Sequence, residues 1–578
     1  MSREERGLLA RVFLSALLLY GLFTWPFEGE VPLRYVDLTR AIVEDGGLCI
    51  DRWHENTSDK ALVDGHYYAA AAPGPALLGV VPWALVRGLG GSVLLAQALV
   101  TFLVGPLAGA LAVAAFFRLT GLAGSLPLAD RLWATAALGL GTFMFPLATV
   151  LYPHALTLAL GTGAAVAILL HAREQATRTA LAAGALAGAL PLCEYQAAVL
   201  LLALGAWLVL EAGPEPRARA RALGSFAAGA AGPLLILAAY HTACFGAPWR
   251  TGYGAHADAT IRTIQASGAG GFQLPTARTL WEVSFGAARG LFPFAPPLLV
   301  ALALGLRAPA GERARPALGL GVGLLCLLLH AARLNDWYGG FSWGPRYQAA
   351  ALPFWLLPLL SANRPAWARR ALAASTALGA LLSLVGAGTR WAQTLDAALA
   401  EAAAFGLQAK GLGPLLGAGP GYYPAGVERL GPQLVAWTTL GLVLWAGALW
   451  LLWRPGPGPR RVCAALLVLL VTSQALAVSY SWRRQEALRR TLHAQEYISF
   501  VWHFDAPENF VTAADVALLE LGDRALAAAL AERALELAPG TEQAQLRLAL
   551  ARDDEQALAR LAREARDPGV RARARSRR

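Results

Sequence analysis

The stretch SVLLAQALVTFLVGPLAGALAVAAFF, residues 92–117, decides the fold class of this chain. It holds no charged residue and is long enough to cross roughly 30 Å of hydrocarbon as a helix. Residues 132–152 form a second stretch of this kind. Of the 578 residues, 56% are hydrophobic and 15% are charged, whereas a soluble domain carries about 25% charged residues. The chain is therefore expected to be an all-α, polytopic transmembrane helical bundle, because backbone amides in lipid must bond within their own helix.

The arginines predict how the chain is threaded through the membrane. They fall in loops of one parity, which the positive-inside rule assigns to the cytoplasm. The loops are marked by Arg3 and Arg6, Arg118 and Arg131, Arg173 and Arg178, Arg217 to Arg221, Arg307 to Arg315, Arg364 to Arg370, and Arg454 to Arg461.

This parity requires about thirteen spans, if residues 75–90 form a re-entrant or surface helix and residues 180–210 form two short helices broken near Glu194. The first loop, residues 26–90, then lies outside the cytoplasm. The apolar residues 8–25 are interpreted as a retained signal anchor. A net charge of +11 distributed along one membrane face indicates topology, and no nucleic-acid partner is expected.

Five cysteines are scattered without the spacing of a zinc or redox motif. Only Cys49 and Cys244 fall in predicted outer loops. Unpaired thiols are the favoured interpretation, and a disulfide between these two is the alternative.

The first loop concentrates polar residues where a lipid-linked head group would lie. Asp37, Asp51 and Asp59 are candidates for a general base. For each of them the alternative is a solvated loop residue or a helix cap. The candidate positioning groups of this loop are Arg34, His54, Asn56, Lys60, His66, Tyr67 and Tyr68.

Three later segments carry polar residues at predicted outer helix ends. YPHA contains His154, and CEYQ contains Glu194 and Tyr195. An acid at membrane depth is costly, so Glu194 is expected to have an arginine or a carrier-borne cation as its partner.

Two arginines stand at outer helix mouths, Arg289 in RGLFPFAPP and Arg346, beside Tyr347, in DWYGGFSWGPRYQ. Guanidinium groups bind phosphate through two parallel hydrogen bonds, so the two arginines predict a phosphate clamp. Snorkelling anchors at the membrane surface are the alternative.

The order of these motifs resembles the GT-C superfamily of membrane glycosyltransferases. RYVDLTRAIVEDGGLCID, HENTSDKALVDGHYY, APG, YPHA, CEY, CFGAPWRTGY, RGLF and GGFSWGPRY follow one another over about the first 350 residues. The group that the chain resembles is related to the protein O-mannosyltransferases and the lipid-A aminoarabinose transferases. The resemblance implies a thirteen-span architecture, a polyprenyl-phosphate-linked sugar donor, transfer outside the cytoplasm, and a first-loop aspartate as base.

The chain departs from this family at two places. Relatives have a lysine before the proline of APG that meets the carrier phosphate, whereas YYAAAAPG has Ala71 or Ala72 there. Either Lys60, Arg289 and Arg346 carry the phosphate alone, or this chain has lost or altered its activity. Glu28 and Glu30 are also spaced unlike the usual paired acids. We therefore rank Asp37 first as base and Asp59 second, with Asp51 as a structural or metal-binding alternative.

The composition changes after residue 480. DVALLELGDRALAAALAERALELAP resembles one tetratricopeptide repeat, with Gly522, Ala527, Ala534 and Pro539 at its small-residue and terminating positions. The expected organisation is a transmembrane domain, residues 1–480, and a small helical tail, residues 481–578, outside the cytoplasm. The tail is a candidate surface for a protein partner.

The resulting hypothesis is an inverting glycosyltransferase of a bacterial inner membrane. Its expected partners are membrane lipid, a polyprenyl-phosphate-linked sugar, and a glycan, lipid or protein acceptor. No cofactor is specified, although a divalent metal is compatible with the acids. A lipid-linked sugar transporter or flippase would use the same acids and arginines without making a bond, and an inactive scaffold is the third alternative.

Overall fold

The computed structural model describes residues 2–25, 30–124, 126–333, 337–340, 342–361, 365–389, 394–409, 431–453 and 507–576. Two compact units can be separated, residues 1–392 with 406–475, and residues 393–405 with 476–578. Glu28, the start of the Arg346 segment at Asp336, and the change of composition near residue 480 lie outside the described residues.

The first unit begins with the helix that leads into the first loop. Its elements up to the first long membrane helix are α1 (Arg3–Leu22), α2 (Glu30–Arg40), the π-helix η1 (Ala41–Asp45), the 3-10 helix η2 (His54–Asn56), β1 (Lys60–Val63), β2 (His66–Ala69) and α3 (Gly74–Gly88). The two strands pair antiparallel, with Lys60 opposite Ala69.

The remaining described elements of this unit are mostly helices. They are α4 (Val93–Phe102), η3 (Leu103–Leu107), α5 (Ala108–Ala123), α6 (Leu128–Gly139), α7 (Met144–Leu147), α8 (Pro153–Glu174), α9 (Thr177–Cys193), η4 (Tyr195–Ala197), α10 (Ala198–Glu211), α11 (Pro216–Phe245), η5 (Gly252–Ala255), α12 (Ala259–Ala266), α13 (Ala277–Phe285), α14 (Leu291–Phe294), α15 (Pro297–Leu306), η6 (Ala310–Glu312), α16 (Ala314–Ala331), η7 (Arg346–Ala351), α17 (Leu352–Trp355), η8 (Leu357–Leu360), α18 (Ala366–Gly388) and α21 (Gly431–Leu452).

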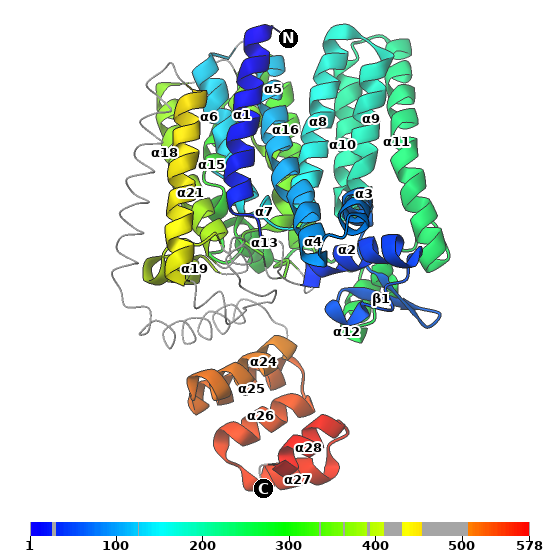
Figure 1. Ribbon diagram of the computed structural model, residues 1–578, viewed down its shortest axis with the longest axis vertical. Helices are drawn as coiled ribbons and strands as arrows, with labels where there is room; N and C mark the ends of the chain where they lie inside the picture. Colours follow the sequence, from blue (N-terminus) through cyan, green and yellow to red (C-terminus); the bar gives the residue numbers. More distant parts are fainter. Residues whose placement is uncertain are drawn as a thin grey trace. The chain divides into compact units, whose positions relative to one another are not determined.

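Helices long and apolar enough to cross a membrane confirm the predicted fold class. Among the described residues there are five, Val93–Ala123, Pro153–Glu174, Pro216–Phe245, Ala314–Ala331 and Ala366–Gly388. The first contains residues 93–117 of the stretch 92–117. Figure 1 shows the long helices of this unit side by side, with α2 and β1 at one end of them. The chain is an all-α helical membrane protein, while the total of thirteen spans stays a prediction.

The stretch 132–152 does not form one continuous helix, contrary to the sequence prediction. Helix α6 ends at Gly139, and the short α7 follows after a break. The hydroxyl of Thr142 donates a hydrogen bond to the carbonyl of Leu138, and Gly141 and Pro146 lie in and after the break. Glycine and proline both disfavour a continued helix, which explains why apolar length alone misled here.

The predicted break near Glu194 is confirmed. Glu194 has extended backbone angles between α9 and α10. Helix α9 packs closely on α11 because it carries Gly184 and Gly188 one turn apart. A Cβ atom on Gly184 would lie 1.9 Å from the carbonyl oxygen of Phe226, so only glycine permits this approach.

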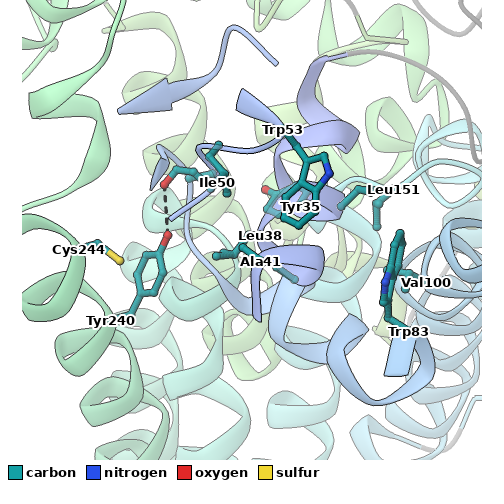
Figure 2. Close-up of a cluster of buried hydrophobic side chains, with 14 of the residues drawn as sticks. Tyr35, Leu38, Ala41, Ile50, Trp53, Trp83, Val100, Leu151, Tyr240 and Cys244 are labelled. Atoms are coloured by element: carbon teal, nitrogen blue, oxygen red, sulfur yellow. Dashed lines mark hydrogen bonds between the residues drawn. The ribbon is translucent and has the colours of Figure 1, made fainter. Parts of the chain in front are cut away.

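A buried apolar cluster holds the first loop onto the membrane helices. Tyr35 and Leu38 of α2 pack with Trp83 of α3, and Ile50 and Tyr240 join the same cluster. Figure 2 shows these side chains converging from the loop and the helices. The hydroxyl of Tyr240 also donates a hydrogen bond to the carbonyl of Ala69, with an O···O distance of 3.3 Å. The first loop is thus packed on the membrane helices through a shared core.

A helical tail was predicted for residues 481–578. The described part of the second unit consists of helices. Its described elements are α19 (Leu395–Phe405), α24 (Pro507–Val516), the π-helix η10 (Ala517–Leu521), α25 (Arg524–Leu537), α26 (Glu542–Arg552), α27 (Glu555–Glu564) and α28 (Pro568–Ser576). Ala527 and Ala534, two small residues of the repeat pattern, are fully buried in its core. Gly522 has a φ of 65°, the left-handed conformation that favours glycine.

Candidate functional site

Helix α2 presents two charged groups on one face. Arg34 and Asp37 are three positions apart, which places them next to each other along a helix. Both side chains are buried, and Asp37 has no exposed surface. Burial of charged groups is costly unless each is compensated, so their partners define the chemistry of this face.

The guanidinium of Arg34 contacts the carboxylate of Asp59, which directly precedes β1. Arg34 also donates to the hydroxyls of Tyr35 and Tyr253, at 2.9 and 3.3 Å. Burial alone would raise the pKa of Asp59, but the charge of Arg34 outweighs it and holds that pKa below its usual range. Asp59 is therefore a stably ionised partner of Arg34.

His256 approaches Asp59 from the loop after α11. Its Nε2 lies 3.6 Å from a carboxylate oxygen of Asp59, and its side chain is fully buried. The backbone N–H of Asp258 donates to Nδ1 of His256 at 3.1 Å. Because Nδ1 accepts a hydrogen bond, the ring proton of the neutral histidine lies on Nε2, directed toward Asp59.

This loop is attached to the hairpin by backbone contacts. His256 forms a bridge with Ala61, and the N–H of Ala257 donates to the carbonyl of Lys60 at 2.8 Å. A Cβ on Gly252 would lie 2.6 Å from the Cα of Ala70, so glycine allows the close contact. Residues nearly two hundred positions apart are in this way held around Asp59.

Asp37 has a different environment from Asp59. One carboxylate oxygen accepts a hydrogen bond from the side chain of Asn56 at 3.0 Å. The other oxygen is buried and has no hydrogen-bond partner among the described residues. Burial raises the pKa of Asp37 to about 7, against the smaller opposing effects of Asn56, Arg40 and Lys60. A carboxyl group with this pKa exchanges its proton near neutral pH, as a general base must.

Lys60 is held by neighbouring groups of the loop. Its ammonium donates to the carbonyl of His54 and lies 3.2 Å from Nδ1 of that ring. The His54 ring stacks on Tyr67 with centroids 4.0 Å apart, and Lys60 lies 5.2 Å from the centroid of Tyr67. The aromatic and cationic groups predicted from the sequence therefore form one cluster beside Asp37.

The third acid, Asp51, lies on the outer side of the hairpin. Its carboxylate contacts Nδ1 of His66 at 2.7 Å and accepts a hydrogen bond from the backbone N–H of Tyr67 at 2.6 Å. Slight burial would raise its pKa, but these two hydrogen bonds lower it. Asp51 thus links residue 51 to strand β2.

The side chain that contacts Glu194 differs from the arginine that the sequence predicted. The carboxylate of Glu194 contacts Nδ1 of His154 at 3.1 Å, so a histidine takes the place expected of an arginine. Two predicted residues of separate segments thereby meet. The charges of Arg346 and Arg333 also act on Glu194. Nδ1 of His241 donates to the carbonyl of Pro248, so its Nε2 accepts a hydrogen bond from the hydroxyl of Tyr195 at 3.0 Å.

The APG element lies against the CEY element. A Cβ on Gly74 would lie 2.6 Å from the sulfur of Cys193, so only glycine fits at this contact. Ala71 and Ala72, which stand where the family lysine is expected, are both buried. The cysteines of the described part of the chain, Cys49, Cys193, Cys244 and Cys326, are free thiols.

The predicted clamp of Arg289 and Arg346 requires correction at Arg289. This side chain is fully buried, and its guanidinium donates to the carbonyls of Tyr338, Ala288 and Gly340 at 3.0, 2.7 and 2.9 Å. These bonds use the donors that a phosphate would need. Arg289 is thereby bound to the turn that precedes Arg346.

Arg346 lies between two tyrosine rings. Its guanidinium lies 5.3 Å from the ring centroid of Tyr152 and 5.2 Å from that of Tyr347. It donates to the Tyr347 hydroxyl at 3.4 Å. Its charge also contributes to lowering the pKa of Asp59, which places it toward the first loop.

Three residues of the site were missed from the sequence. Tyr253 and His256 surround the ion pair of Arg34 and Asp59, and His241 contacts Tyr195. His256 follows the quoted motif CFGAPWRTGY by only three positions. A histidine next to a glycine-rich turn was the available signal, but its burial depends on the distant hairpin.

A comparison with protein families gave no match, and a comparison with curated proteins gave none. Among solved structures, the chain is similar to the archaeal oligosaccharyltransferase AglB from Archaeoglobus fulgidus, solved with an inhibitory peptide and a dolichol-phosphate. The TM-score is 0.36 and the identity 13%, over 65% of this chain and 54% of AglB. The chain thus matches about half the length of that protein, and a match of this size does not establish a common fold.

Proposed function

We propose that this membrane protein transfers a sugar from a polyprenyl-phosphate carrier to an acceptor outside the cytoplasm, with Asp37 as the general base. The observation that carries the proposal is the contrast between two acids of one loop. The charge of Asp59 is compensated by its ion pair with Arg34. Asp37, by contrast, is buried and has a pKa of about 7. One of its oxygens has no hydrogen bond to the described residues. The order of motifs that resembles the GT-C glycosyltransferases supports the choice of substrate.

In this mechanism the ionised carboxylate of Asp37 removes the proton of an acceptor hydroxyl or amine. The acceptor oxygen or nitrogen attacks the anomeric carbon, and the bond from that carbon to the carrier phosphate breaks with inversion. Asn56 holds the carboxylate of Asp37 through a hydrogen bond to its other oxygen. A guanidinium stabilises the phosphate that leaves, and Arg346 is the candidate, because Arg289 is engaged with backbone carbonyls.

A second function is binding of a lipid head group without transfer. One observation favours it, namely that Ala71 and Ala72 are buried where relatives carry a phosphate-binding lysine. The ammonium of Lys60 donates a hydrogen bond to the carbonyl of His54 instead. A contact between the missing lysine and the phosphate that forms fully only in the transition state contributes more to the rate than to binding. Its loss would therefore reduce transfer more than it reduces carrier binding.

The test uses membrane vesicles that contain the full chain and the native acceptors, supplied with polyprenyl phosphates carrying radiolabelled sugars. We expect label to move from the carrier to an acceptor with the unaltered protein. Asp37→Asn should bind the carrier and reduce transfer by about a hundred- to ten-thousand-fold, the usual effect of removing a general base. Asp45→Asn, in the same loop, is the matched control and should transfer normally.

Two results decide between the functions. Normal transfer by Asp37→Asn would overturn Asp37 as base. Carrier binding without transfer by the unaltered protein, across the sugars supplied, would favour the head-group-binding function. Arg346→Ala should weaken carrier binding by about 1.5–3 kcal/mol, the value of a charged hydrogen bond, in either case.

A further inference from the structure

A group of metal-ligating side chains lies apart from Asp37, on the outer side of the first loop. Cys49, Asp51 and His66 each offer one ligand atom, and these three atoms all lie within 4.8 Å of one another. A thiolate, a carboxylate and an imidazole are together the ligand types of Zn²⁺ and similar borderline cations. Neither the proposed transfer reaction nor the resemblance assigns a function to this group.

The backbone explains why the three side chains converge. The N–H of Ile50 donates to the carbonyl of Tyr67 at 2.8 Å, and the side chain of Ile50 is buried in the loop core. Cys49 and Asp51 flank the buried Ile50 in the chain and are both more exposed than it. Asp51 reaches His66 across the pairing.

The geometry needs only a small adjustment to admit a cation. Ligand atoms around tetrahedral zinc are separated by roughly 3.3–3.8 Å, as follows from metal–ligand bonds of about 2.0–2.3 Å. Nδ1 of His66 and the carboxylate of Asp51 are now 2.7 Å apart, so a cation would replace their hydrogen bond. The second oxygen of Asp51 is held by the N–H of Tyr67, the kind of outer contact that orients a metal ligand.

We propose that Cys49, Asp51 and His66 bind a divalent transition-metal cation of the zinc type, with water in the fourth position. The cation would tie residues 49–51 to strand β2. Tyr67 follows His66 directly and stacks on His54 beside Lys60, so the same cation would stiffen the loop that carries the candidate site. This proposal does not depend on the transfer reaction.

The test uses the full chain, purified in detergent with a tag free of histidine and stripped of metal by a chelator that is then removed. Co²⁺ should bind with a thiolate-to-metal charge-transfer absorption, and Zn²⁺ should displace it. Cys49→Ser should abolish the absorption, and Cys49→Ser and His66→Gln should each bind Zn²⁺ at least tenfold more weakly. Asp64→Asn, in the turn between β1 and β2, is the control and should bind as the unaltered protein does.

The unaltered protein alone already tests the proposal, so it does not depend on the folding of any variant. Absence of a thiolate absorption with Co²⁺ would overturn it, and so would Zn²⁺ affinity that Cys49→Ser leaves unchanged. Circular dichroism and gel filtration of each variant show whether it retains the fold of the unaltered chain.

Discussion

The guanidinium of Arg34 contacts the carboxylate of Asp59, although the two residues are 25 positions apart and belong to different elements of the first loop. Arg34 lies on α2, and Asp59 directly precedes β1. Because this ion pair lowers the pKa of Asp59, its carboxylate stays ionised near neutral pH. Asp37, on the same helix as Arg34, is the acid that we propose as the base.

The ion pair is expected to stabilise the first loop. Arg34→Ala should lower the free energy of unfolding by about 3–5 kcal/mol, because it leaves the carboxylate of Asp59 buried without its main counter-charge. The double variant Arg34→Ala with Asp59→Ala should recover part of this loss. Unfolding in detergent measures both. Arg52→Ala breaks an exposed pair with Asp45 and should change stability by less than about 1 kcal/mol. Equal effects of Arg34→Ala and Arg52→Ala would contradict the assignment.

The pKa of Asp37 predicts how stability depends on pH. Its folded value of about 7 exceeds its unfolded value of 3.8, so the unfolded chain loses this proton first as pH rises. The contribution of Asp37 to stability therefore falls between these two values and is constant above them. Asp37→Asn removes the ionisation and should gain stability over the unaltered protein as pH rises from 4 to 7. A difference in melting temperature that stays constant over this range would show that Asp37 has an ordinary pKa.

The same group predicts how transfer depends on pH. A general base must be ionised before it accepts a proton, so the rate of transfer should rise as pH increases through about 7. The rate at saturating donor should be measured in vesicles, because binding of the carrier phosphate has its own pH dependence. A rate already at its maximum at pH 5 would move the role of base to an acid of ordinary pKa.

Arg289 is expected to act on stability and not on donor binding. Arg289→Lys keeps the charge but cannot reach the carbonyls of Tyr338 and Gly340 with a planar group, so unfolding should become easier by about 2–5 kcal/mol. The folded fraction should bind polyprenyl phosphate normally. Arg278→Lys, at an exposed arginine of α13, serves as control. Loss of carrier binding by folded Arg289→Lys would restore the two-arginine clamp.

The topology remains a prediction from the arginine-rich loops. Reporter proteins fused after Asp64 and after Gly540 should both show a location outside the cytoplasm. A fusion in the loop after α8, near Arg178, should show a cytoplasmic location. A cytoplasmic signal at Gly540 would mean that the number of spans is even.

The fold class could be predicted because it depends on local properties. Uncharged length is sufficient to identify a helix in lipid, so the helix at residues 92–117 was predicted correctly. The break at Glu194 was also predicted correctly. The stretch 132–152 was not, because a break at Gly141 does not change the mean hydropathy. The rank of Asp37 above Asp59 came from the spacing of Glu28 and Glu30, which departs from the family pattern.

The different environments of the two acids come from the tertiary structure. A carboxyl group acquires a raised or lowered pKa from burial and from nearby charges, and these come from distant parts of the chain. Arg34, and His256 from beyond α11, surround Asp59, while the packed loop buries Asp37. In the same way, the carbonyls of Tyr338 and Gly340 accept hydrogen bonds from Arg289. The sequence by itself determined a helical membrane protein with a group of acids between its first apolar stretches. Folding decided which acid is charged, because only contacts in space set the electrostatic environment.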